Sequence, residues 1–209
     1  MNIIEKLQWR YATKKFDNQK KLSRESIETL KKAFDLTATS YGLQPIKLVI
    51  VSDDKVKEEL LPHSWNQKQV VQASHILIFC IETAVDERYI KGYFDLVKDE
   101  RSTPDEVLSP FRSSLIKSFE KMTEEEKYIW ASKQAYLAMG NLLTVCSLME
   151  VDACPMEGFL PAKYDEILSL KDKGLSSVLV MPVGYRAEDD MFSNFKKVRR
   201  GVSESVIEL

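Results

Sequence analysis

Two basic segments near opposite ends of the chain, and one turn between them, carry the residue types best suited to binding a ligand. Residues 10–16 (RYATKKF) and 196–200 (KKVRR) are cationic, and residues 154–159 (CPMEGF) follow an apolar run that predicts a β-strand. Pro155 and Gly158 would end this strand and expose backbone N–H groups. Together these features suit a ligand with a phosphate at one end and an acceptor-rich ring at the other. Flavin mononucleotide (FMN) is such a ligand.

Each segment has a chemical role in this hypothesis. Arg10, Lys197 and Arg199 would hold a phosphate, because guanidinium groups offer forked donors. Lys14 would stabilise the negative charge that a reduced flavin gains near N1 and its C2 carbonyl. A backbone N–H at 157–158 would donate to flavin N5, since glycine lets the backbone approach closely. A solvated lysine, a basic surface run and an ordinary turn explain the segments singly, so the hypothesis rests on their combination.

The composition is that of an ordinary globular protein. The chain has 209 residues, 44% of them hydrophobic, and a formal net charge of −2, which disfavours a dedicated nucleic-acid binder. Its three cysteines form no CxxC or zinc spacing, and neither histidine has a partner at metal-ligand spacing, so we expect no metal site. No signal peptide is recognisable, and the apolar runs are too short to span a bilayer. We therefore expect a soluble, cytoplasmic protein.

Apolar periodicity predicts strands that alternate with helices. Runs rich in branched residues predict buried strands at 48–51, 76–81, 151–155 and 177–183. Helical spacing predicts a short helix from Ile3, a second capped by Ser23, and others at 55–61, 124–149 and 163–168. Region 85–122 is expected to form a helical, mobile excursion over the core. These elements predict the α+β class, with one central sheet in a single domain covering residues 1–209.

The chain lacks the glycine-rich loops that bind nucleotides in other α/β proteins. Neither Gly-x-Gly-x-x-Gly nor the P-loop pattern is present. A Rossmann dinucleotide site and a P-loop kinase or GTPase are therefore disfavoured. For the same reason no acidic or arginine discriminator is available to choose between NADH and NADPH.

Several short motifs resemble, in order and spacing, the FMN-dependent nitroreductase family, close to its oxygen-insensitive nitroreductase and dihydropteridine reductase branch. The similarity covers nearly the whole chain. Besides the three segments above, the motifs are 38–40 (ATS), 44–45 (QP), 66–69 (NQKQ), 73–75 (ASH), 133–136 (KQAY), 140–141 (GN) and 183–185 (VGY). This resemblance implies a nitroreductase-like fold with a central mixed β-sheet surrounded by helices. It also implies an intertwined homodimer with C-terminal strand exchange and two FMN sites at its interface.

The resemblance assigns the cofactor-binding residues by position. Within one subunit they would be Arg10, Tyr11, Ala12, Lys14, Asn66, Gln69, Pro155, Met156, Glu157, Gly158, Lys197 and Arg199. The other subunit would contribute Thr39, Ser40 and Gly42. Lys14, Glu157 and Gly158 would serve the reaction itself. The chain departs from the family pattern at Gly42, where Asn is frequent, at Gln69, where the branch has Lys, and at Ile46, where Trp is usual.

The implied function is an FMN enzyme that transfers hydride from NAD(P)H through flavin N5 to nitroaromatic, quinone or related acceptors, with ping-pong kinetics. Three alternatives stay open at this stage. One is a flavin reductase of a specific metabolite, such as a pteridine or enone. Another is a flavin-binding or regulatory protein that does not turn over. The third is a colourless anion-binding module.

Overall fold

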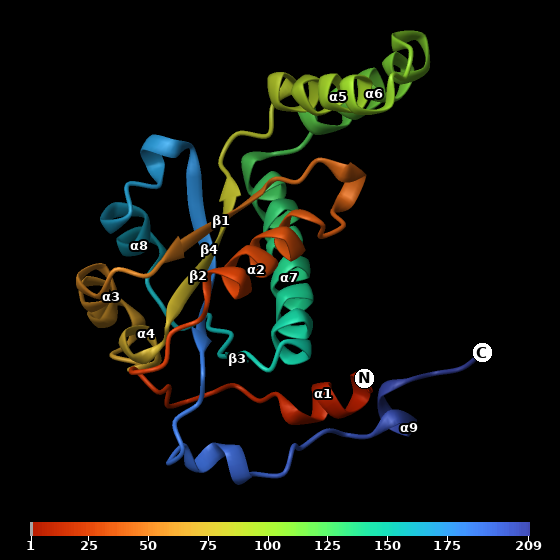
Figure 1. Ribbon diagram of the computed structural model, residues 1–209. Helices are drawn as coiled ribbons and strands as arrows, with labels where there is room; N and C mark the ends of the chain where they lie inside the picture. The colour runs from red at the N-terminus through yellow and green to blue at the C-terminus, as the bar shows by residue number, and fades with distance from the viewer. Residues whose placement is uncertain (1) are drawn as a thin grey trace.

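The computed structural model describes residues 2–209, and a four-stranded sheet lies at its centre (Figure 1). The strands are β1 (Ile46–Val51), β2 (His75–Glu82), β3 (Asp152–Ala153) and β4 (Leu175–Gly184), in the order β1-β2-β4-β3. The predicted α+β class is confirmed. The four strands pair antiparallel throughout, however, and so do not form the mixed sheet that we expected. One parallel pairing occurs, an isolated bridge between Ala12 and Ala153 of β3.

The antiparallel pairing follows from the path of the chain. The segment between β1 and β2 leaves and returns at one end of the sheet, so Val51 lies opposite Ile76. The segment between β2 and β4 does the same at the opposite end, where Glu82 lies opposite Leu175. A strand that begins where its neighbour ended must run in the opposite direction.

Helices cover both faces of the sheet. Successive side chains of β2 point to opposite faces, and six of its eight residues are therefore buried. Leu77, Phe79 and Ile81 face α2 (Arg24–Asp35) and α7 (Glu124–Leu148). Ile76, Ile78 and Cys80 face the opposite side. That side is covered by α3 (Asp54–Leu60), α4 (Gln69–Gln72) and α8 (Pro161–Ile167), with the short 3-10 helices η2 (Leu61–Ser64) and η3 (Lys171–Lys173) between them.

Local signals account for the ends of the main helices. The Ser23 hydroxyl accepts a hydrogen bond from the Ser26 N–H, as the sequence predicts. A capping box between Thr123 and Glu126 begins α7. The first helix, α1 (Ile3–Trp9), ends at Arg10, which lies in extended conformation. The strand predicted at 151–155 is observed only as Asp152–Ala153. Beyond it, the N–H groups of Cys154 and Met156 still donate to carbonyls of β4.

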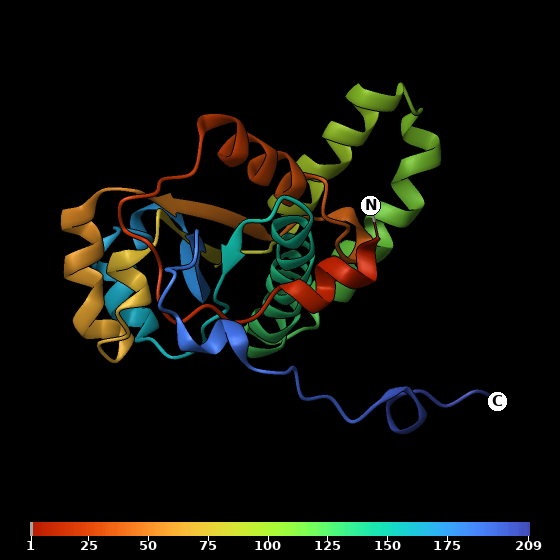
Figure 2. The ribbon, with the colours of Figure 1, turned by 60° about the horizontal axis from the view of Figure 1, so that its bottom comes forward.

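Two helices, α5 (Glu87–Arg101) and α6 (Asp105–Glu120), project from one end of the body (Figures 1 and 2). They enclose a small core of their own that includes Ile90, Phe94 and Phe119. The 3-10 helix η1 (Ser40–Gly42) lies at the base of this projection, where the Tyr41 ring is near those of Phe119 and Trp130.

The C-terminal segment leaves the body after the 3-10 helix η4 (Met191–Asn194) and extends away from it (Figure 2). It contains one helical turn, α9 (Val202–Ser205). Among residues 2–209, no helix is long and apolar enough to cross a membrane.

Candidate functional site

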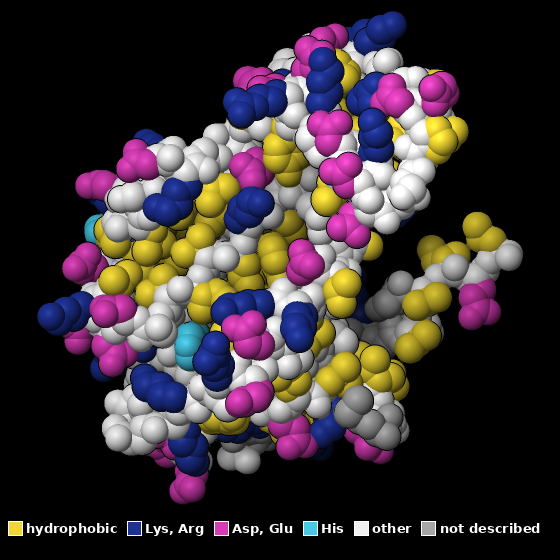
Figure 3. Space-filling view, turned by 45° about the horizontal axis from the view of Figure 1, so that its top comes forward, with side chains coloured by type: hydrophobic (Ala, Val, Ile, Leu, Met, Phe, Trp, Pro, Cys, Tyr) yellow, Lys and Arg dark blue, Asp and Glu magenta, His cyan; other side chains and the backbone are white. Residues whose placement is uncertain are grey.

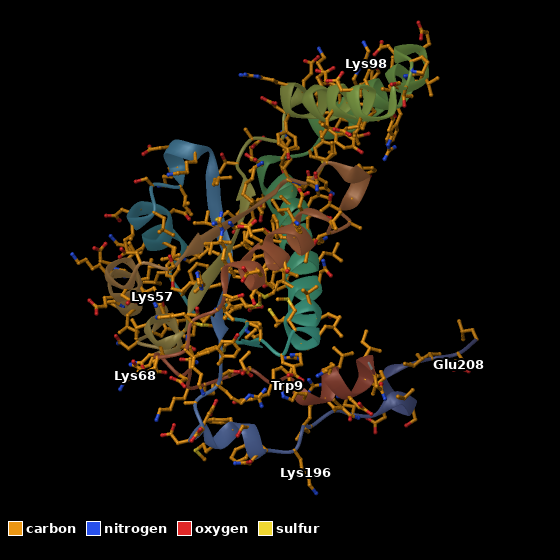
Figure 4. All side chains as sticks on the ribbon, viewed as in Figure 1. Trp9, Lys57, Lys68, Lys98, Lys196 and Glu208 are labelled. Atoms are coloured by element: carbon orange, nitrogen blue, oxygen red, sulfur yellow. The ribbon has the colours of Figure 1, made fainter. Side chains whose placement is uncertain are left out.

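A cavity of about 420 Å³ brings together the two basic segments from opposite ends of the chain. Six residues that the sequence predicts line it: Arg10, Tyr11, Ala12, Lys14, Lys197 and Arg199. Arg10 caps α1, whereas Lys197 and Arg199 lie on the extended arm that follows η4. The Lys197 ammonium donates to the Arg10 carbonyl and joins the two segments directly. In Figure 4 the labelled Trp9 and Lys196 mark the two segments that meet here.

The cations in this cavity repel one another. Burial lowers the pKa of Arg10, and the charge of Arg199 lowers it further. Burial also lowers the pKa of Lys197, with added repulsion from Arg10 and Arg199. A bound anion would relieve this repulsion, so the electrostatics of the cavity favour a negatively charged group.

A buried carboxylate that the sequence analysis missed lies beside the cavity. Asp190 accepts hydrogen bonds from the Tyr11 hydroxyl and from the backbone N–H groups of Lys14 and Lys15. Burial opposes its charge, yet these hydrogen bonds lower the pKa of Asp190 overall. In the sequence, Asp190 ends an acidic loop (AEDD) that looks solvated, and no local pattern marks it as buried.

Arg186 contacts the aromatic residues at positions 9 and 11. Its guanidinium lies 4.2 Å from the centre of the Trp9 ring and 4.6 Å from that of Tyr11. It also forms an ion pair with the buried Asp152, at 2.6 Å between Nη2 and Oδ1. The aromatic contacts and the ion pair together orient Tyr11.

Lys14 connects the cavity to the turn after β3. Its ammonium lies 4.0 Å from the sulfur of Cys154, and the Gln69 amide nitrogen lies 4.0 Å from the same atom. Cys154 is fully buried. Burial raises the pKa of its thiol, and Lys14 and Gln69 only partly oppose that effect. The thiol therefore stays protonated at neutral pH and is not a candidate nucleophile.

The turn at 155–158 is held against β4 and against the loop before α4. Met156 forms a bridge with Val180. The carbonyl of Gly158 accepts a hydrogen bond of 3.0 Å from the Gln67 amide. A Cβ on Gly158 would lie 2.8 Å from the Trp65 ring and 2.9 Å from the Gln67 amide nitrogen, so a larger residue here would have to displace these side chains. Asn66 follows Trp65 directly and has a positive φ of 53°. The turn thus comes close to the 66–69 motif.

Glu157 is exposed at this turn, and its carboxylate accepts a hydrogen bond of 2.7 Å from the Tyr136 hydroxyl. This bond raises the pKa of Tyr136. The contact ties the turn to the middle of α7, because Tyr136 lies on that helix.

Thr39, Ser40 and Gly42 lie elsewhere in the chain. The Ser40 N–H donates to the Gln134 side chain at 2.9 Å, which fixes η1 to α7. Gly42 has a φ of +72°, and a Cβ there would lie 2.2 Å from the Tyr93 hydroxyl oxygen. In Figure 1 this orange segment lies by the upper part of α7, remote from α1. One chain therefore does not bring η1 to the cavity, and its role across a dimer interface stays a prediction.

No group of His, Cys, Asp and Glu that could hold a metal ion occurs within residues 2–209.

Known proteins are similar to this chain in sequence and in fold. The sequence pattern of the Nitroreductase family matches residues 7–185. An oxygen-insensitive NAD(P)H nitroreductase of Enterobacter cloacae is 31% identical over 216 residues, which cover 100% of each chain. A Staphylococcus aureus protein provisionally named an NAD(P)H nitroreductase is 35% identical over 99% of this chain and 94% of its own. An Exiguobacterium sibiricum protein crystallised with FMN shares the fold at a TM-score of 0.84 and 17% identity, over 100% of this chain and 98% of its own.

Proposed function

Since the chain belongs to the nitroreductase family, we propose that it is an FMN-dependent oxidoreductase that uses NAD(P)H to reduce a small organic acceptor. The observation that carries this proposal is the meeting of Arg10, Lys197 and Arg199 at one cavity. The path from Lys14 through Cys154 to Gln69 then leads from this cavity to the glycine turn.

The side chains present fit both ends of FMN. The three cations repel one another, and they supply the forked and point-charge donors that a phosphate accepts. At the other end, the amides of Asn66 and Gln69 combine donors and acceptors, as a ring with alternating polar atoms requires. Between them, Gly158 has no side chain, which favours close approach of the backbone to a ligand.

When bound, FMN would supply hydride-transfer chemistry at its N5 between NAD(P)H and a second substrate, in a ping-pong scheme. Lys14 would stabilise negative charge on the reduced cofactor. The backbone of Glu157 and Gly158 would orient the ring beside the turn. No side chain of this site needs to form a covalent bond. Nitroaromatics and quinones are the acceptors that we expect to be reduced.

We propose that the working form is a homodimer in which Thr39, Ser40 and Gly42 complete the site of the other subunit. Hydrophobic side chains on α1 and α7 are exposed in the single chain, among them Ile4, Leu137 and Ile129. The C-terminal arm projects from the body and carries further hydrophobic side chains, including Ile207 and Leu209 (Figure 3). An isolated subunit would leave all of this apolar surface in water.

The outer edge of β1 offers a place for the arm of a second copy. In the order β1-β2-β4-β3, β1 has one neighbour, so one of its edges is unpaired within residues 2–209. An extended segment can add to such an edge through main-chain hydrogen bonds. Strand exchange by residues 206–209 would cover this edge and bury the arm.

The proposal is tested by an absorbance spectrum of the purified protein after reconstitution with FMN. We expect flavin bands at roughly one FMN per chain. Steady-state oxidation of NADH and NADPH with an added quinone then separates an enzyme from a protein that only binds flavin. Absence of flavin binding would refute the cofactor assignment. Flavin binding without turnover would refute the enzyme assignment.

A further inference from the structure

The side chain of Asp190 lies between the two segments that supply the cations. It is 2% exposed. Its Oδ2 accepts hydrogen bonds from the Tyr11 hydroxyl at 2.8 Å and from the N–H groups of Lys14 and Lys15 at 3.0 and 3.2 Å. Its Oδ1 accepts from the N–H of Phe192 at 3.2 Å. One oxygen therefore binds residues 11–15, and the other binds the start of the segment that leads to Lys197 and Arg199.

The chain before η4 is also held at Lys15, whose carbonyl accepts from the Ala187 N–H at 3.0 Å and whose ammonium pairs with Asp189, but the arm after η4 has few attachments. Residues 194–200 are exposed, and η4 is the last element before them. Phe192 and Phe195 pack on each other, with ring centres 5.3 Å apart. Lys197 reaches the Arg10 carbonyl, but like charges on Arg10 and Arg199 oppose its approach. The arrangement of the three cations thus depends on how firmly η4 is held to residues 11–15.

We propose that Asp190 is a positioning residue that joins residues 11–15 to η4 and so assembles the cation cavity before any ligand binds. The proposal rests on the proposed function for the identity of the ligand, FMN. Asp190 does not touch the ligand in this proposal; it affects ligand binding by holding Tyr11, Lys14 and the C-terminal arm in place.

An amide at this position cannot replace the carboxylate. Asparagine has a single acceptor oxygen, whereas Asp190 uses both of its oxygens. If the amide oxygen faced Tyr11 and Lys14, its NH₂ group would face the Phe192 N–H. If it were turned the other way, the NH₂ group would face three donors. In either orientation at least one donor to Asp190 loses its partner, and the two segments become less firmly joined.

The test compares Asp190→Asn with Asp165→Asn, a matched control. Asp165 is also buried and accepts from the Ser177 N–H and the Ser176 hydroxyl, and it does not line the cavity. We expect Asp190→Asn to raise the Kd for FMN at least about tenfold and the Kd for riboflavin, which lacks the phosphate, less than about threefold. The ratio of the two constants should be unchanged in Asp165→Asn. An unchanged ratio in a folded Asp190→Asn protein would overturn the proposal.

Two further measurements keep the test decisive. Hydrogen exchange on the ligand-free protein should be faster in Asp190→Asn at the amides of Lys14, Lys15 and Phe192 together. The Val180 amide, which bonds to Met156, serves as an internal reference that should not change. If the wild-type protein bound no flavin, the proposed function would fail, and this exchange result would still decide whether Asp190 joins the segments.

If Asp190→Asn does not fold, Tyr11→Phe replaces it in the test. This variant removes one donor to Asp190 and keeps the ring beside Arg186. We expect a smaller loss in the same direction, with the Kd for FMN rising about threefold and that for riboflavin rising less. No change in their ratio would contradict the positioning role.

Discussion

Replacement of Arg199 by alanine tests whether the cavity binds a phosphate. Arg199 lines the cavity together with Arg10 and Lys197, and its charge contributes to the lowered pKa of both. Its guanidinium also donates to the Val198 carbonyl at 2.6 Å, a local contact that the substitution removes without opening a buried space. The change should therefore affect ligand binding more than folding.

The expected size of the effect follows from opposing contributions. A hydrogen bond to a charged group contributes about 1.5–3 kcal/mol, which corresponds to a rise in Kd of about tenfold to a hundredfold. Removal of Arg199 also relieves repulsion on Arg10 and Lys197 in the empty cavity, and solvent screens this exposed side chain. Both effects reduce the loss. We expect the Kd for FMN to rise about tenfold to thirtyfold, with turnover at saturating FMN much less affected.

The assay is fluorescence titration of the apoprotein with FMN, repeated with riboflavin and at two salt concentrations. Arg200→Ala is the matched control, because it removes the same side chain from the next residue, which does not line the cavity. Arg199→Ala should also weaken the salt dependence of FMN binding, since one charge contact with phosphate is lost. Equal effects of the two substitutions, or an equal loss of riboflavin affinity, would refute the phosphate assignment.

Three further predictions concern charge and assembly. Lys14→Met should lower the midpoint potential of bound FMN, because it removes a positive charge beside the reduced ring; spectroelectrochemistry showing an unchanged or raised potential would place Lys14 elsewhere. Because the pKa of Lys197 is lowered in the free protein and an anion should restore it, FMN binding near pH 10 should take up protons. Calorimetry in buffers of different ionisation enthalpy measures this uptake, and proton release would contradict it. Deletion of residues 202–209 should abolish dimerisation and weaken flavin retention, and an FMN-loaded, active monomer in light scattering would contradict the proposed assembly.

The sequence alone determined the features that depend on neighbouring residues. The strands near 76–81 and 177–183 were predictable, because branched apolar residues in short runs favour buried β-structure. The start of α2 was predictable from Ser23, since capping uses a side chain adjacent to the helix. The cationic segments at 10–16 and 196–200 were likewise visible as local clusters of charge. Their shared ligand could be proposed from chemistry, and a family resemblance assigned them the same cofactor.

Tertiary structure decided what local patterns do not encode. The direction of strand pairing depends on where each connection returns, so the antiparallel sheet could not be derived from the strands themselves. Asp190 resembles any loop carboxylate until the fold surrounds it with four donors. The close contact between Gly158 and the Trp65 ring joins residues that lie 93 positions apart in the sequence. Such contacts form only when distant segments pack together, because a side chain's burial and partners are properties of the folded chain.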